Sequence, residues 1–121
     1  MPADKNQFYI IDDDESVCRS LRALLATYGF SAKSFTCAED FFSTVPNSSP
    51  GCLLLDLHLP AVNGWEIQQR LSDSGSKRPV IIITADEDAG LMKRAFQAGA
   101  MGFLHKPFKS QELVDLIYMA F

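Results

Sequence analysis

The chain has 121 residues, a usual size for one domain, which is long enough to bury a core without disulfides or a structural metal. Eleven Lys and Arg against fifteen Asp and Glu give a net charge of −4 without a basic stripe, so we expect no nucleic-acid binding by this domain. Three cysteines without CxxC spacing indicate reduced thiols. Without a secretory leader pattern or an apolar run long enough to span a bilayer, the sequence predicts a cytoplasmic protein with no membrane contact.

Short apolar runs alternate with segments of helical periodicity along the whole chain. Strands are predicted at 8–11, 31–35, 52–55, 80–83 and 101–105. Helices are predicted at about 17–28, 38–45, 65–72 and 88–98, and from 109 onward, with Gly29 and Gly99 ending the first and fourth. Strands joined by helical crossovers predict an α/β fold of three layers, a doubly wound, flavodoxin-like five-stranded parallel sheet with helices on both faces.

Polar residues follow four of the predicted strands. The stretch YIIDDDES, residues 9–16, runs from an apolar strand into Asp12 and Asp13, and the third, fourth and fifth strands are followed by Asp56, Thr84 and Lys106. Because ligands of open α/β sheets bind where the carboxyl ends of the strands meet, we expect these residues to converge.

The types of these residues indicate a chemistry. Carboxylates about 5 Å apart repel by roughly 3 kcal/mol per pair at an effective dielectric constant near 20, so three of them need a cation or protons. Oxygen ligands without His or Cys favour Mg²⁺, with Mn²⁺ also suitable. A Lys and a Thr hydroxyl could bind an anion next to that cation. The combination predicts a phosphoryl site with an aspartyl nucleophile.

Four segments give the chain a family resemblance: IIDDDESVCRSL, LLLDLHLPAVNGWEI, VIIITA and AFQAGAMGFLHKPF. In order and spacing they resemble the receiver domains of bacterial two-component response regulators, over essentially the whole chain. The sequences of these segments are most similar to receivers of the nitrogen-fixation regulator type, which carry a helix-turn-helix output domain. The resemblance implies the strand order 2-1-3-4-5.

The resemblance also implies site roles. Asp56 would accept a phosphoryl group from a sensor histidine kinase, and Lys106 and Thr84 would contact its oxygens. Asp13 would bind Mg²⁺ directly and Asp12 mainly through water. The implied metal ligands are Asp12, Asp13, Asp56 and the backbone carbonyl of His58.

A conformational switch is implied as well. Thr84 would move toward the phosphoryl group and Phe103 would turn inward, while a cis bond before Pro107 would aim Lys106 at the site. Residues 1–121 would form one receiver domain that catalyses only its own phosphotransfer and dephosphorylation. We expect an output domain to follow it, which the switch would control in transcription. A phosphorylation-dependent homodimer is a further expectation.

Other functions stay open at this point. A phosphohydrolase of the haloacid-dehalogenase type would use Asp12 and Asp14 as its Asp-x-Asp motif, but Asp56 and Lys106 would then have no role. A flavodoxin-like nucleotide binder would need a phosphate loop where this chain has acids. A third alternative is an interaction module that works without phosphorylation.

Several of these residues also have purely structural interpretations. Asp14 and Glu15 fit the first turn of a helix, where acids interact favourably with the helix dipole, and Asp12 or Asp13 alone could cap that helix. The side chains of His58 and His105 are expected at the surface, and Phe103 could be plain core.

Overall fold

The computed structural model describes residues 7–46, 49–57, 64–73, 78–85 and 90–120. Its strands are β1 (Gln7–Ile11), β2 (Ser31–Phe35), β3 (Cys52–Asp56), β4 (Val80–Thr84) and β5 (Gly102–His105). Its helices are α1 (Glu15–Thr27), α2 (Ala38–Thr44), α3 (Gly64–Asp73), α4 (Gly90–Gln97) and α5 (Ser110–Ala120).

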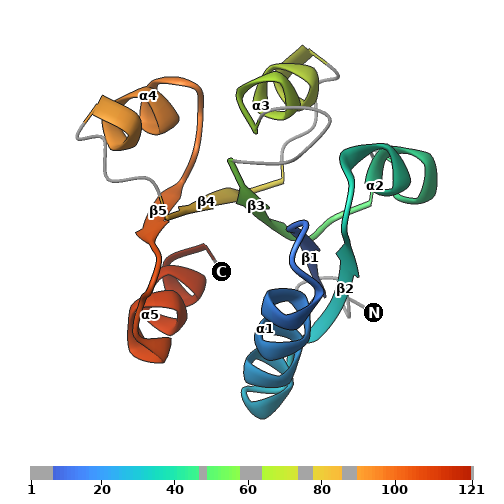
Figure 1. Cartoon of the computed structure of the whole chain (residues 1–121), viewed down its shortest axis with the longest axis vertical. Helices are drawn as coiled ribbons and strands as arrows, with labels where there is room; N and C mark the ends of the chain where they lie inside the picture. The colour runs from blue at the N-terminus through green and yellow to red at the C-terminus, as the bar shows by residue number, and fades with distance from the viewer. Residues whose placement is uncertain (1–6, 47–48, 58–63, 74–77, 86–89, 121) are drawn as a thin grey trace.

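The five strands form one parallel sheet in the order β2-β1-β3-β4-β5. Helices α2, α3 and α4 cover one face and α1 and α5 cover the other, so the molecule has three layers (Figure 1). The predicted fold class and strand order are confirmed.

Burial explains why the central strands carry unbroken apolar runs. Every residue of β3 and of β4 is buried, as expected for strands covered on both faces. Edge strand β2, by contrast, contains no fully buried residue. The core accordingly divides into two clusters, with Phe41 and Ile67 on the α2–α4 side and Cys18 and Leu113 on the α1–α5 side.

The predicted boundaries differ from the observed ones in ways that concern the site. Both β3 and β4 extend one residue further than predicted, so Asp56 and Thr84 are the last residues of their strands. Strand β5 begins one residue later than predicted, at Gly102. The predicted start of the fourth helix, at 88, lies outside the described residues.

The cap of α1 corrects one expectation. Neither Asp12 nor Asp13 caps this helix. The cap is Asp14, whose Oδ1 accepts hydrogen bonds from the backbone N–H of Ser16 at 2.9 Å and of Val17 at 3.4 Å. Asp14 therefore precedes the first turn, while Glu15 lies within it as predicted.

Two predicted backbone features are confirmed. Gly29, just after α1, has a φ of 85°, a conformation that L side chains rarely adopt, and it ends the helix. The Lys106–Pro107 peptide bond is cis. Among the described residues, no helix is long and apolar enough to cross a bilayer.

Candidate functional site

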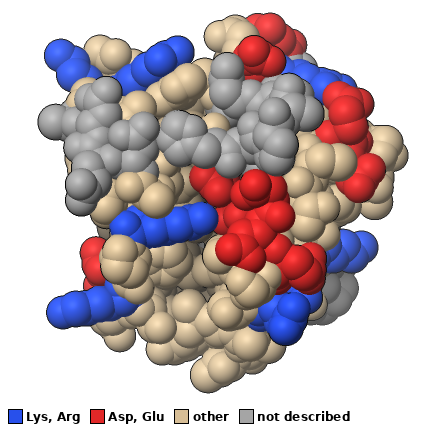
Figure 2. All heavy atoms as spheres, viewed as in Figure 1, with Lys and Arg blue, Asp and Glu red and all other residues tan. Residues whose placement is uncertain are grey.

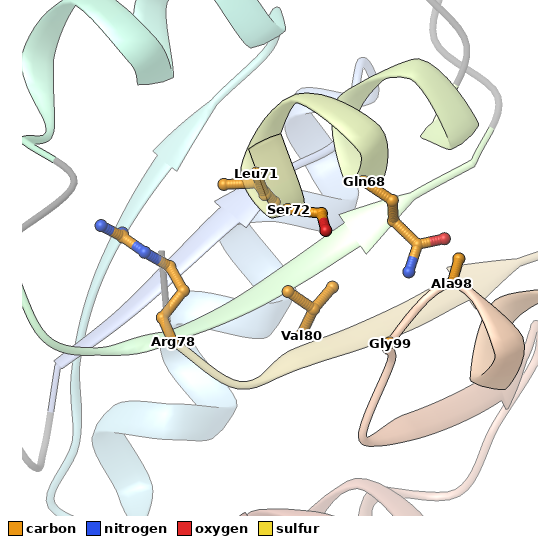
Figure 3. A pocket seen from close by; sticks show the side chains of 7 residues that line it. All are labelled: Gln68, Leu71, Ser72, Arg78, Val80, Ala98 and Gly99. Carbon is orange, nitrogen blue, oxygen red and sulfur yellow. The ribbon is translucent and has the colours of Figure 1, made fainter. Parts of the chain in front are cut away.

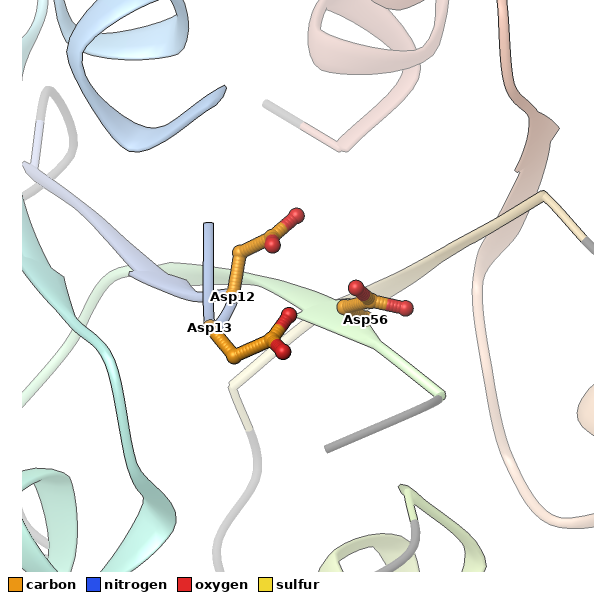
Figure 4. A group of neighbouring side chains, drawn as sticks. All are labelled: Asp12, Asp13 and Asp56. Carbon is orange, nitrogen blue, oxygen red and sulfur yellow. The ribbon is translucent and has the colours of Figure 1, made fainter. Parts of the chain in front are cut away.

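Three carboxylates converge at the carboxyl edge of the sheet. One oxygen each from Asp12, Asp13 and Asp56 lies within 4.8 Å of the others. Figure 4 shows the three side chains close to one another at the ends of β1 and β3. On the molecular surface, acidic side chains gather on this face next to a basic side chain (Figure 2). The predicted convergence of these acids is therefore observed.

The backbone brings these acids together. Strands β1 and β3 are neighbours, with Ile11 opposite Leu55, so the residues that come next, Asp12 and Asp56, emerge side by side. The N–H of Asp12 donates to the carbonyl of Phe35 at 3.1 Å, which continues the β1–β2 pairing by one residue. Asp12 is only 2% exposed and Asp56 only 7%, so burial increases their mutual repulsion.

Lys106 supplies a positive charge to this cluster. Its Nζ lies 2.9 Å from Oδ2 of Asp12 and 3.4 Å from Oδ2 of Asp56. Burial by itself lowers the pKa of Lys106, but the hydrogen bond to Asp12 and the charges of Asp56 and Asp12 together raise that pKa above its ordinary value. The ammonium therefore stays protonated over the physiological range.

Thr84 and Phe103 lie on the same face of the sheet. Phe103 pairs with Ile82, and Thr84 is two residues after Ile82, so their side chains point to the α2–α4 side. Thr84 is fully buried, and Phe103 is partly buried against the core on that side. The carbonyl of Thr84 accepts a hydrogen bond from the N–H of Lys106 at 2.7 Å. Thr84, Lys106 and Asp56 therefore lie at one edge of the sheet.

The two histidines considered in the sequence, His58 and His105, are not observed as part of this cluster. His58 lies outside the described residues, so its predicted metal role is not observed. His105 is exposed, which confirms the prediction that its side chain lies at the surface.

Contacts around Asp12 include two that the sequence did not suggest. The backbone N–H of Asp14 donates to Oδ1 of Asp12 at 3.0 Å, and the thiol of Cys18 donates to the Asp12 carbonyl oxygen at 3.3 Å. Cys18 is on the buried side of α1, and its spacing from Asp12 gave no sign of this contact. Both bonds fix the backbone and the carboxylate of Asp12.

The donor set fits a hard divalent cation. All three converging side chains offer carboxylate oxygen, the ligand that Mg²⁺ and Mn²⁺ prefer. Lys106 carries one positive charge for three carboxylates, so a cation of charge two would bring the cluster to neutrality.

Residues 8–118 match the family model described as Response regulator receiver domain. The chain belongs to this family. Response regulator protein TodT of Pseudomonas putida is 37% identical to it over 112 residues, which are 93% of this chain and 49% of TodT. Transcriptional regulatory protein FixJ of Bradyrhizobium diazoefficiens is 35% identical over 116 residues, 96% of this chain and 57% of FixJ.

The receiver domain also matches solved structures of this family. The crystal structure of FixJ-N superposes with a TM-score of 0.84 at 34% identity, over 94% of this chain and 91% of that one. Against its curated relatives the receiver domain spans about half of their length. The predicted resemblance to receiver domains of response regulators is confirmed, FixJ is among the relatives as expected, and the family replaces the phosphohydrolase alternative.

Proposed function

We propose that Asp56 is the phosphoacceptor of this receiver domain. The supporting observation is its central place: β3 lies between β1 and β4 in the sheet, so Asp56 has Asp12 and Asp13 on one side and Thr84 on the other. Its Oδ2 also lies 3.4 Å from the ammonium of Lys106. The alternative nucleophile, Asp12, already accepts hydrogen bonds at both carboxylate oxygens.

The transfer itself is a substitution at phosphorus. An Asp56 carboxylate oxygen forms a bond to the phosphorus of a phosphohistidine on a sensor histidine kinase, and the P–N bond to the imidazole breaks. The imidazole nitrogen keeps the electron pair of that bond and takes up a proton. Water later attacks the acyl phosphate and releases inorganic phosphate, which restores the carboxylate. The receiver thereby catalyses its own phosphotransfer and dephosphorylation but turns over no other substrate.

A divalent cation, Mg²⁺ or Mn²⁺, would be held by Asp12, Asp13 and Asp56, with the backbone carbonyl of His58 completing the protein ligands. When bound, it neutralises charge on the carboxylates and on the incoming phosphoryl oxygens. Lys106 would release part of its ion pairing with Asp12 to bind one phosphoryl oxygen.

Thr84 and Phe103 would form the switch. The Thr84 hydroxyl donates to a phosphoryl oxygen, and the movement of Thr84 leaves space on the α2–α4 side into which Phe103 turns. Phosphorylation then shifts the population between two packed states of this face. Pro107, the residue after Lys106, would help to keep the Lys106 side chain directed at the site.

In the full-length protein we expect residues 1–121 to act as the cytoplasmic receiver for an output domain. Two of the matched relatives are named as a response regulator and a transcriptional regulator, which supports control of transcription by phosphorylation. Phosphorylation-dependent pairing of two receivers is a further part of this proposal.

The function is tested by intact-mass measurement after incubation with Mg²⁺ and acetyl phosphate. One added phosphoryl group is expected, and it should be absent in Asp56→Asn and after chelation of the metal. A wild-type mass that stays unchanged with excess donor and metal would contradict the proposal.

A further inference from the structure

Cys18 connects α1 to the turn that carries two of the three clustered carboxylates. Its thiol donates to the carbonyl oxygen of Asp12 at 3.3 Å, and the residue is fully buried. The N–H of Asp12 still pairs with Phe35 of β2, so the Asp12 carbonyl lies where the chain leaves the sheet. Among the described residues, the Cys18 thiol is the one donor to this oxygen. The peptide group between Asp12 and Asp13 is therefore fixed from α1.

This peptide group determines the direction of two carboxylates. Because a peptide group is planar, holding the carbonyl oxygen of Asp12 also fixes the N–H and the Cα of Asp13. Both side chains belong to the cluster with Asp56. A cluster whose carboxylates are in place before a cation arrives binds that cation without the cost of ordering them. Cys18 can therefore act on the cluster through the backbone.

The thiol is itself held by a chain of polar contacts that begins at the surface. The hydroxyl of Ser34, on β2, is a hydrogen-bond partner of the Cys18 sulfur. Nη1 of Arg22 donates to Oγ of Ser34, and Nη2 of Arg22 lies 3.3 Å from Oε1 of Glu15. Because Arg22 can only donate, the Ser34 hydroxyl keeps its own hydrogen for the sulfur. The thiol hydrogen is then directed at Asp12.

We propose that Cys18 is a positioning residue for the binding of a divalent cation by Asp12, Asp13 and Asp56. It contacts neither the cation nor a carboxylate, and it acts through the backbone of Asp12. This inference rests on the metal site of the proposed function. Positioning requires a hydrogen-bond donor at residue 18, whereas a packing role requires only an apolar group of the right size.

Substitutions at this position separate the two requirements, with Mg²⁺ affinity measured by calorimetric titration of the metal-free domain. Cys18→Val is similar in size but has no donor, and it should weaken Mg²⁺ binding about fivefold. Cys18→Ser keeps a donor but places a hydroxyl in the core. It should therefore unfold at lower urea concentration than the wild type and yet bind Mg²⁺ within about twofold of it. Cys18→Ala also lacks the donor and should match the valine variant, which covers the case that valine does not fold.

Two control variants change the core without changing the turn. Cys52→Val replaces a second buried thiol of the same core cluster, at the opposite end of β3 from Asp56. Val80→Ala destabilises the other face of the sheet, where Val80 lines a hollow of about 160 Å³ together with Gln68 and Ala98 (Figure 3). Both should bind Mg²⁺ as the wild type does. An equal loss of affinity in either control would overturn the positioning role.

Amide hydrogen exchange gives a readout without any metal. The N–H of Asp14 donates to Oδ1 of Asp12, and it should exchange about fivefold faster in Cys18→Val, whereas a purely structural role would speed exchange in β3 as well. Wild-type Mg²⁺ affinity in Cys18→Val or Cys18→Ala would overturn the inference, and so would a serine variant as weak as the valine variant. No binding of Mg²⁺ by the wild type would instead contradict the metal site, and with it the proposed function.

Discussion

The Nζ of Lys106 lies 2.9 Å from Oδ2 of Asp12, although the two residues are 94 positions apart in the chain. The Asp12 side chain is almost fully buried, and that of Lys106 is 23% exposed. The pair therefore holds the end of β5 to the end of β1 across the site, and it limits the repulsion among the three carboxylates.

Replacing Lys106 by Met should destabilise the fold when no divalent cation is present. The buried carboxylates of Asp12 and Asp56 would lose their cation, which should cost about 2 kcal/mol. Urea unfolding without metal measures the loss, and added Mg²⁺ should restore part of it. Lys106→Arg, which keeps the charge, is the control. Equal stability of Lys106→Met and wild type without metal would show that the ion pairs contribute nothing.

Asp13→Asn should weaken Mg²⁺ binding about tenfold, because one charge is removed within a few ångströms of the cation. Calorimetric titration of the unphosphorylated domain measures this change. Asp14→Asn is the matched control, since it removes a neighbouring charge whose carboxylate is occupied with the amides at the start of α1. If the Asp14 variant lost as much affinity as the Asp13 variant, the assignment of Asp13 as a ligand would be wrong.

The buried thiol of Cys52 should lower the free energy of unfolding of the domain at alkaline pH. Burial raises the pKa of its thiol to about 12 from an ordinary value of 9.0. The unfolded chain therefore releases this proton first, so the stabilising difference is complete below pH 9.0 and is lost as the pH rises toward 12. Between these limits the wild type should lose up to about 1.4 kcal/mol per pH unit relative to Cys52→Ala. Urea unfolding at several pH values measures the difference, and parallel curves would contradict the burial of the thiol.

Gly51→Ala should destabilise the domain by about 3 kcal/mol. Gly51 has a φ of 136°, and a Cβ there would lie 2.8 Å from Cε2 of Tyr9 and 3.0 Å from the carbonyl oxygen of Gln7. Gly29→Ala is the control, because its φ of 85° is also positive but a Cβ would meet nothing within 4 Å. It should cost only about 1 kcal/mol. Thermal unfolding compares the two, and equal losses would mean that the contact with Tyr9 and Gln7 contributes little.

The sequence predicted the fold and the convergence of the acidic side chains for an identifiable reason. Unbroken apolar runs such as those of β3 and β4 mark strands buried on both faces, and parallel strands place their carboxyl ends at one edge. The convergence of Asp12, Asp13 and Asp56 follows from that topology alone. The prediction of a cis bond before Pro107, by contrast, rested on the family resemblance and not on the residue types.

Features that depend on side-chain packing could not be predicted in the same way. Whether Asp12, Asp13 or Asp14 caps α1 depends on the residue at which the backbone enters the helical conformation. Four consecutive acidic residues give no sequence signal for that position. The acceptor left buried on Gln68, and the stacking of Arg94 on Trp65, depend on how α3 and α4 pack together. Neither helix carries a periodicity that distinguishes these residues from ordinary surface positions.

The most direct test of the central claim locates the phosphoryl group. After phosphorylation with acetyl phosphate and Mg²⁺, borohydride reduces an aspartyl phosphate to homoserine, and peptide mass spectrometry then identifies the residue that was converted. Homoserine is expected at position 56 alone, dependent on Mg²⁺ and absent without the phosphodonor. Homoserine at Asp12 or Asp13, with Asp56 unchanged, would contradict it.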